Sequence, residues 1–335
     1  MSYDPILVVN AGSTSVKLHL VEGGESRPIG SLAEAAGCAA AAHRVVHGGP
    51  RFTEPVVIDD AVEREIRALE PIAPLHNAPA LRGIADARRA LPGIPHVAVF
   101  DTAFHATIPA PARTYAIPER WRDGLGIRRY GFHGLSVEWC ARQIRVPRLV
   151  VCHLGGGCSV TAVRDGRSVD TTMGFSPLEG VPMATRSGSV DPGAMLYLLR
   201  EHGLDADSLD RALEHESGLL ALAGSADART LAPGSLALAV FAHRVAGAVA
   251  TMAVATGGLD ALAFTAGIGE GSALVRAEVC ARLAFLGVEL DRERNAAAAE
   301  GDVATARSSA RVYVVRAHEE LVAAQAAQAL LAARE

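Results

Sequence analysis

The sequence ILVVNAGSTS at 6–15 has a counterpart later in the chain, LVVCHLGGG at 149–157. In both places an apolar run leads into a turn of small residues, and a second apolar segment then leads into a tight turn, at Glu22-Gly23 and at Asp165-Gly166. This order is typical of a β-hairpin, because small residues accept the backbone angles of tight turns. One long-range recurrence predicts two similar domains, each beginning with such a hairpin.

Segments with helical and with strand spacing alternate around these two hairpins. Val62, Ile66 and Leu69 fall on one face of a predicted helix, and the apolar run 95–100 predicts a buried strand that ends at Asp101. Strands and helices in both halves predict an α/β protein of two domains, with the ligand site in the cleft between them. Longer helices are predicted at 235–256, 272–285 and 319–333.

The composition fits a folded protein with small partners. With 335 residues, half of them hydrophobic and 21% charged, the chain has enough apolar residues for two cores. The net charge of −5 and the lack of a Lys- or Arg-rich run give no reason to expect nucleic acid or an anionic membrane surface as a partner. We therefore expect small-molecule substrates, no nucleic acid and no membrane.

Three features favour a cytoplasmic location. The five cysteines lack the spacing of a disulfide framework or a zinc site, which is typical of a reducing compartment. The N-terminal residues show neither the basic segment nor the cleavage site of a signal peptide. The longest apolar stretch, 236–259, contains His243, Arg244 and several glycines, so a core helix is favoured over a membrane span.

Two turns have the composition of phosphate sites. Residues 10–17 (NAGSTSVK) combine small residues, hydroxyl groups and one lysine, and the three consecutive glycines within 153–157 leave backbone N–H groups open. The order of a Walker A loop, GxxxxGK[ST], is absent from 10–17. Each turn alone is as compatible with an ordinary hairpin as with a phosphate site.

Four segments bring Arg, His and Asp residues next to glycines. They are HRVVHGG (43–49), FDTAFH (100–105), RRYGFHG (128–134) and the stretch 170–188, which ends in TRSG. Such side chains bind and stabilise oxyanions. A single His or Arg is more often a surface or capping residue, so the argument depends on the whole set.

These motifs occur in the same order in the acetate kinase family, which the chain resembles over nearly its whole length. The resemblance implies the duplicated fold of sugar kinases, actin and the heat-shock ATPases, with a ribonuclease H-like core in each domain. We place the first domain at 1–103, with the C-terminal helix 320–335 packed on it, and the nucleotide-binding domain at 104–319. Further motifs that carry the resemblance are VNAGSTSVK (9–17), APLHN (73–77), HLGGG (153–157) and FTAGIGEGS (264–272).

A member of this family would transfer a phosphoryl group reversibly between ATP and a short carboxylate, with Mg2+ or Mn2+, and would form a homodimer. The resemblance implies that Asn10 and Glu319 hold the metal. The implied catalytic residues are Arg44, Asp101, His133 and Arg186. The acyl group would be bound by Arg44, Val46, Leu75, His76, Phe132 and Pro177. The nucleotide would be bound by Ser13, Ser15, Lys17, His153, Leu154, Gly155, Gly156, Gly157, Asp227, Ala228, Arg229, Gly267, Ile268, Gly269, Glu270 and Gly271.

Phosphoryl transfer to a carboxylate requires positively charged and hydrogen-bond-donating groups of this kind. A carboxylate is already a nucleophile at neutral pH, so no general base is needed, and the barrier lies in bringing anions together. Two arginines, Lys17, the metal ion and a protonated or donating His133 would supply the positive field, and Asp101 would orient the metal or the nucleophile.

Gly156 departs from the family pattern. Acetate kinases usually have Asn at this position, whereas butyrate kinases carry HLGGG, and Gly271 and His318 also stand where Asn is usual. The segment between the first hairpin and His43 is shorter than in ordinary members. Two alternatives to an acetate kinase therefore stay open: a propionate or butyrate kinase, and a catalytically impaired nucleotide-binding regulator. Retention of the four catalytic residues argues against the regulator.

Overall fold

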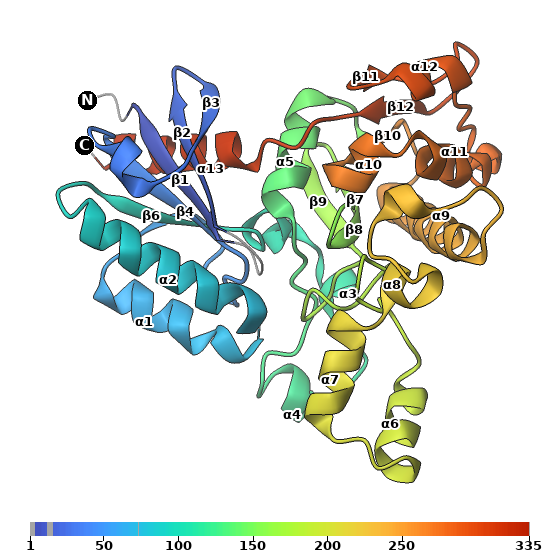
Figure 1. The fold of residues 1–335 in the computed structure, drawn as a ribbon, viewed down its shortest axis with the longest axis horizontal. Coiled ribbons are helices and arrows are strands. Elements are labelled where there is room, and N and C mark those ends of the chain that lie inside the picture. The colour runs from blue at the N-terminus through green and yellow to red at the C-terminus, as the bar shows by residue number, and fades with distance from the viewer. Residues whose placement is uncertain (1–3, 12–15, 73, 335) are drawn as a thin grey trace.

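The computed structural model describes residues 4–11, 16–72 and 74–334, and in these the chain forms two six-stranded sheets (Figure 1). The strands of the first sheet are β1 (Ile6–Ala11), β2 (Val16–Glu22), β3 (Glu25–Ile29), β4 (Ala40–Val45), β5 (Val56–Val57) and β6 (His96–Phe100). Their order is β3-β2-β1-β4-β6-β5. β1 pairs antiparallel with β2 and parallel with β4, so the predicted hairpin opens this sheet.

The second sheet repeats this arrangement. Its strands are β7 (Arg148–Leu154), β8 (Cys158–Arg164), β9 (Arg167–Thr171), β10 (Ala261–Thr265), β11 (Gly301–Asp302) and β12 (Arg311–Val314), in the order β11-β12-β10-β7-β8-β9. Each sheet has an antiparallel meander, a parallel centre and one antiparallel edge strand. The predicted α/β fold with two similar halves is therefore confirmed.

The first sheet is apolar at nearly every central position because helices cover both of its faces. Along β1, Ile6 and Val8 pack with α13 (Glu319–Ala332), whereas Leu7 and Val9 lie on the opposite face, toward α2 (Pro74–Ala90). The predicted helix containing Ile66 is α1 (Asp60–Ala68), which packs beside α2. The domain division at 103/104 stays a prediction, which the separate sheets and the packing of α13 support.

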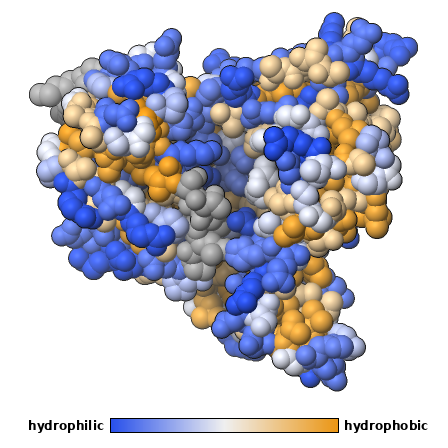
Figure 2. All heavy atoms as spheres, viewed as in Figure 1, coloured by the Kyte–Doolittle hydropathy of each residue, from blue (hydrophilic) through white to orange (hydrophobic). Residues whose placement is uncertain are grey.

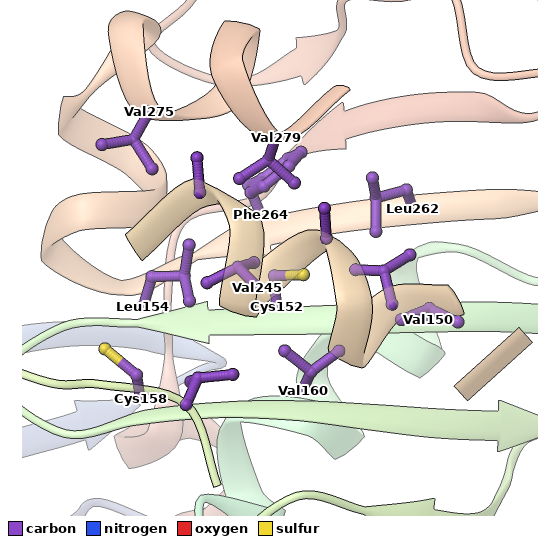
Figure 3. Packing of buried hydrophobic residues seen from close by; sticks show 14 of the residues in the cluster. Val150, Cys152, Leu154, Cys158, Val160, Val245, Leu262, Phe264, Val275 and Val279 are labelled. Carbon is purple, nitrogen blue, oxygen red and sulfur yellow. The ribbon is translucent and has the colours of Figure 1, made fainter. Parts of the chain in front are cut away.

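The second sheet is covered in the same way. α9 (Leu236–Thr256) and α11 (Ala273–Ala281) lie on one face, and α5 (Gly134–Gln143) lies on the other. Figure 3 shows Val245 of α9 among Cys152, Val160 and Phe264 of the sheet. Each fully buried side chain of this size contributes about 1.5–3 kcal/mol, so this cluster is a main source of stability.

Among the described residues, α9 is the one helix long and apolar enough to cross a membrane by length and composition. Half of its most apolar window is buried inside the protein, against β7, β8 and α11. This packing agrees with the core helix predicted for 235–256. The helix predicted at 272–285 is shorter than expected, because α11 ends at Ala281 and a 3-10 turn, Ala284–Leu286, leads into Gly287 with a φ of +77°.

Short helices fill the connections between these elements. They are α3 (Ala110–Arg113), α4 (Glu119–Arg122), α6 (Pro192–Glu201), α7 (Ala206–His215), α8 (Gly218–Ala223), α10 (Ala266–Gly271) and α12 (Arg292–Ala297). α6 and α7 form an extension below the second sheet (Figure 1). Figure 2 shows polar side chains over much of this face and apolar side chains both on the right side of the molecule and on this extension. Leu196 and Tyr197 of α6 are exposed.

Candidate active site

A cavity of ≈ 400 Å³ lies between the two sheets, and most of the residues that line it, including all four predicted catalytic residues, are predicted site residues. Arg44 is near the end of β4, Asp101 follows β6, and His153 is near the end of β7. The carboxyl ends of parallel strands meet at one edge of a sheet, and ligands of α/β proteins bind there. The cavity is lined by Arg44, Val46, Asp101, Phe132, His133, His153, Gly156, Gly157, Pro177, Ala184, Thr185, Arg186 and Glu319.

Arg44 is held by the side chains around it. Its Nε donates to Asp101 Oδ1 at 2.9 Å, its Nη2 contacts the second oxygen of the same carboxylate, and its Nη1 donates to Asn10 Oδ1 at 3.0 Å. Nη1 also lies 3.5 Å from Glu319 Oε2, and Asn10 Nδ2 donates to that oxygen at 3.3 Å. The side chain of Asp101 is 1% exposed, so its main partner in the fold is a buried bidentate guanidinium.

Burial and charge act in opposite directions on these carboxylates. Burial raises the pKa of Asp101, and the guanidinium of Arg44 opposes this shift. Burial also acts to raise the pKa of Glu319, but Arg44, His153 and Asn10 together hold it below its usual value. Glu319 is therefore a carboxylate at neutral pH, facing the cavity.

The metal site predicted at Asn10 and Glu319 has suitable chemistry. Among the residues that the structure describes, no group of three His, Cys, Asp or Glu side chains could hold a metal ion alone. Mg2+ does not need such a group, because it commonly takes one or two protein oxygens, with waters and substrate phosphates as its other ligands. The carboxylate of Glu319 lines the cavity and is a hard oxygen donor that fits this ion. The amide oxygen of Asn10 is a donor of the same kind, but here it accepts a hydrogen bond from Arg44 and the amide nitrogen faces Glu319, so Asn10 would hold a metal ion only after its amide turns.

His133 lies in the cavity wall as a neutral side chain. Its pKa is well below the usual value because of burial and the nearby His153, and the two rings stack with their centroids 3.9 Å apart. Its Nδ1 lies 3.0 Å from Ser159 Oγ. When this hydroxyl donates to Nδ1, the proton of the ring is on Nε2, which lies 3.1 Å from the position of a Cβ added to Gly157. Of the two forms expected from the sequence, protonated or donating, burial favours the neutral ring, and with Ser159 as the donor to Nδ1 this ring donates from Nε2.

Arg186 faces His133 across Gly157. Its Nη1 lies 3.3 Å from Pro177 O and 3.5 Å from the position of a Cβ added to Gly157. Its Nε lies 2.7 Å from Glu214 Oε2. Sequence reasoning missed Glu214 and Ser159, because in the sequence Glu214 has the spacing of an ordinary helix residue and Ser159 lies in an apolar strand segment.

The glycine turn after β7 reaches α10. A Cβ on Gly155 would lie 3.4 Å from Ala266 Cβ and 3.8 Å from Gly267 N, so the turn and the start of α10 are neighbours. Gly156 faces open space: among the described residues, no heavy atom outside its chain neighbours lies within 4 Å of a Cβ placed there. Its φ is outside the positive range, so a residue with a side chain would not strain the backbone here.

Several predicted nucleotide residues do not line this cavity. Lys17 is exposed on β2, opposite Asn10 in the strand register. Arg229 is 87% exposed at the side chain and paired with Asp227. The side chain of Leu154 is buried in the hydrophobic core, so only its backbone groups are available to a ligand. Ile268 is partly buried and packs against the same core. Glu270 accepts a hydrogen bond from Ala317 N at 2.9 Å. Ser13 and Ser15, and the side chains of Leu75 and His76, lie outside the described residues.

Comparisons with known proteins agree with this geometry. Residues 30–325 match the Acetokinase family. An acetate kinase from Synechococcus sp. is 47% identical over 318 residues, which are 90% of this chain and 78% of the relative. The structure of a propionate kinase from Francisella tularensis has a TM-score of 0.88 and 35% identity, with 97% of this chain and 99% of that chain covered. For an acetate kinase from Porphyromonas gingivalis the TM-score is 0.86 at 31% identity, with 98% and 99% covered. The chain therefore belongs to the acetokinase family.

Proposed function

We propose that this protein is an acetate kinase, which transfers the γ-phosphoryl group of ATP to acetate and catalyses the reverse reaction. The observation that carries this assignment is the placement of Arg44, His133 and Arg186 around one cavity between the two sheets. Relatives at 47% and 48% identity that are named acetate kinase support acetate as the acceptor. A homodimer and a cytoplasmic location stay predictions from the sequence.

The chemistry needs positioning and positive charge. One oxygen of acetate attacks the γ-phosphorus, and the bond from that phosphorus to the bridging oxygen of ADP breaks as the new bond forms. Arg186 and the Nε2–H of His133 stabilise the charge on the transferring group, and Arg44 adds its field from the other wall. Val46, Phe132 and Pro177 enclose the apolar end of the acid. A Mg2+ ion held by Asn10 and Glu319 would neutralise phosphate charge.

Trapping of acyl phosphate with hydroxylamine tests the acceptor. The protein is incubated with ATP, Mg2+ and acetate, propionate or butyrate, and the coloured hydroxamate is measured. We expect acetate to give the highest kcat/KM. A higher value for propionate or butyrate would favour the alternative kinases, and no hydroxamate with any acid would favour a nucleotide-binding regulator.

Val46→Ala is expected to improve propionate relative to acetate by several-fold. The substitution removes two methyl groups from the cavity wall, and each buried methylene is worth roughly 0.8 kcal/mol. The ratio of kcat/KM for the two acids is the measurement. An unchanged ratio would show that Val46 does not contact the acyl chain.

Gly156→Asn is expected to raise turnover of acetate about tenfold. The resemblance to acetate kinases implies an amide here, and the open space above Gly156 accepts one without strain. A charge-assisted hydrogen bond to phosphate contributes roughly 1.5–3 kcal/mol, which is enough for this gain if part of it is specific to the transition state.

Gly157→Asn is the matched control. A Cβ at Gly157 would lie 3.1 Å from His133 Nε2 and 3.3 Å from its Cε1, so this side chain should displace the histidine and lower turnover. A stable Gly156→Asn protein that is slower with acetate than its parent would contradict the account and favour a phosphate site made of backbone N–H groups alone.

A further inference from the structure

The loop that carries Arg186 is fastened to the junction of α7 and α8. Ser187 N donates to Leu213 O at 3.0 Å, and Ser217 N donates to Thr185 O at 2.9 Å. Thr185 Oγ1 donates to the backbone oxygen of Glu214 at 2.8 Å. Residues on both sides of Arg186 are therefore hydrogen-bonded to the end of α7 and to the residues just after it. The position of the Arg186 backbone depends on these bonds.

Glu214 is unusual within its helix. The structure describes every residue of α7, and Glu214 is the one buried residue among them, with 9% of it exposed. A helix normally buries apolar residues, and a negative charge in the last turn is opposed by the helix dipole. A buried carboxylate in the last turn of α7 therefore requires a positively charged partner.

That partner is Arg186. The two side chains are 13% and 11% exposed, and Arg186 Nε lies 2.7 Å from Glu214 Oε2. Among the described residues, no group donates a well-aligned hydrogen bond to Glu214 Oε2. The positive charge of Arg186 is therefore what mainly offsets the negative charge of this buried carboxylate. Removing one member of a buried ion pair leaves the other in an unfavourable environment.

The contact also sets the direction of the guanidinium. With Nε beside Glu214, Nη1 lies 3.3 Å from Pro177 O and points toward the space near Gly157. Both Pro177 and Gly157 line the cavity. An arginine side chain has many rotamers, and the ion pair at Nε together with the hydrogen bond from Nη1 to Pro177 O leaves few of them available.

We propose that Glu214 is a positioning residue, which holds Arg186 in the orientation that phosphoryl transfer requires. The inference rests on the proposed acetate kinase function. Misplacement of a catalytic group by about 1 Å can reduce a rate about a hundredfold, so the effect of removing Glu214 falls on kcat rather than on ATP binding.

A double-mutant cycle tests this role. Glu214→Ala is expected to lower kcat for acetyl phosphate formation about ten- to a hundredfold, with the KM for ATP within about twofold of the parent. In the Arg186→Ala background the same substitution should have little further effect, because Glu214 acts through that arginine. Glu214→Gln keeps an acceptor of similar shape and should lose only a few-fold. Glu216→Ala, at the exposed end of the same helix, should retain the parent rate.

Thermal melting shows whether each variant is folded, and Glu214→Gln allows the test to proceed if Glu214→Ala does not fold. A folded Glu214→Ala protein with the parent kcat, or a loss of the same size in both backgrounds, would overturn the positioning role. If Glu214→Ala does not fold, the test uses Glu214→Gln. A decrease in kcat from Glu214→Gln that is equally large in the Arg186→Ala background would also overturn the positioning role. A parent protein that forms no acyl phosphate would instead overturn the proposed function, and this role of Glu214 with it.

Discussion

Arg186→Ala is expected to lower turnover about a thousandfold and to leave ATP binding nearly unchanged. Arg186 lies in the cavity wall beside Gly157, facing His133, where the phosphoryl group passes between oxygens. A charge placed there stabilises the transition state more than the bound nucleotide, so the loss falls on kcat.

Steady-state kinetics and calorimetric titration with ATP separate the two effects. Arg200→Ala removes an exposed arginine of α6 and serves as the control for a loss of positive charge alone. If Arg186→Ala weakens ATP binding and leaves kcat near the parent value, Arg186 belongs to the nucleotide site and not to the catalytic set.

Asp101→Ala is expected to reduce the free energy of unfolding by about 3–5 kcal/mol as well as to abolish activity. The substitution leaves the guanidinium of Arg44 buried without its bidentate partner, and breaking a buried pair in this way is strongly destabilising. Asp101→Asn keeps the shape and one acceptor oxygen, so its loss of stability should be smaller. Urea denaturation of the three proteins gives the comparison.

The same experiment separates two roles for Asp101. From the sequence, this carboxylate is interpreted as orienting the metal or the nucleophile. If that were its main role, Asp101→Ala would unfold at nearly the parent urea concentration and would mainly change the Mg2+ dependence of the rate. The bidentate contact with Arg44 predicts the large loss of stability instead.

The hairpins were predictable because their signals are local. The second apolar segment of the first copy and the small residues before it lie close together in the sequence, as do LVV and GGG in the second copy. The helix around 235–256 was predictable for the same reason, since its apolar residues occur as one long run. The end of α11 was placed too late, because the apolar spacing continues through 284–286, where the backbone forms a 3-10 turn.

The sequence allowed most residues of the cavity wall to be named, but it did not show which of them contact one another. Arg44 and Asp101 are 57 residues apart, and nothing in either segment shows that the carboxylate binds that arginine. Glu214 looks like an ordinary solvent-exposed helix residue in the sequence, and it is buried only because the loop 183–187 packs on the end of α7. Contacts of this kind depend on tertiary structure, which a local pattern does not contain.

Phosphorus NMR of the protein with ATP, Mg2+ and acetate tests the central claim most directly, because it resolves acetyl phosphate, ADP and inorganic phosphate in one mixture. The account predicts that acetyl phosphate and ADP appear at equal initial rates, only when acetate is present, and that acetyl phosphate and ADP added alone give ATP. Release of inorganic phosphate without acetyl phosphate, or ATP that stays intact with acetate present, would contradict the assignment of this cavity as the active site of an acetate kinase.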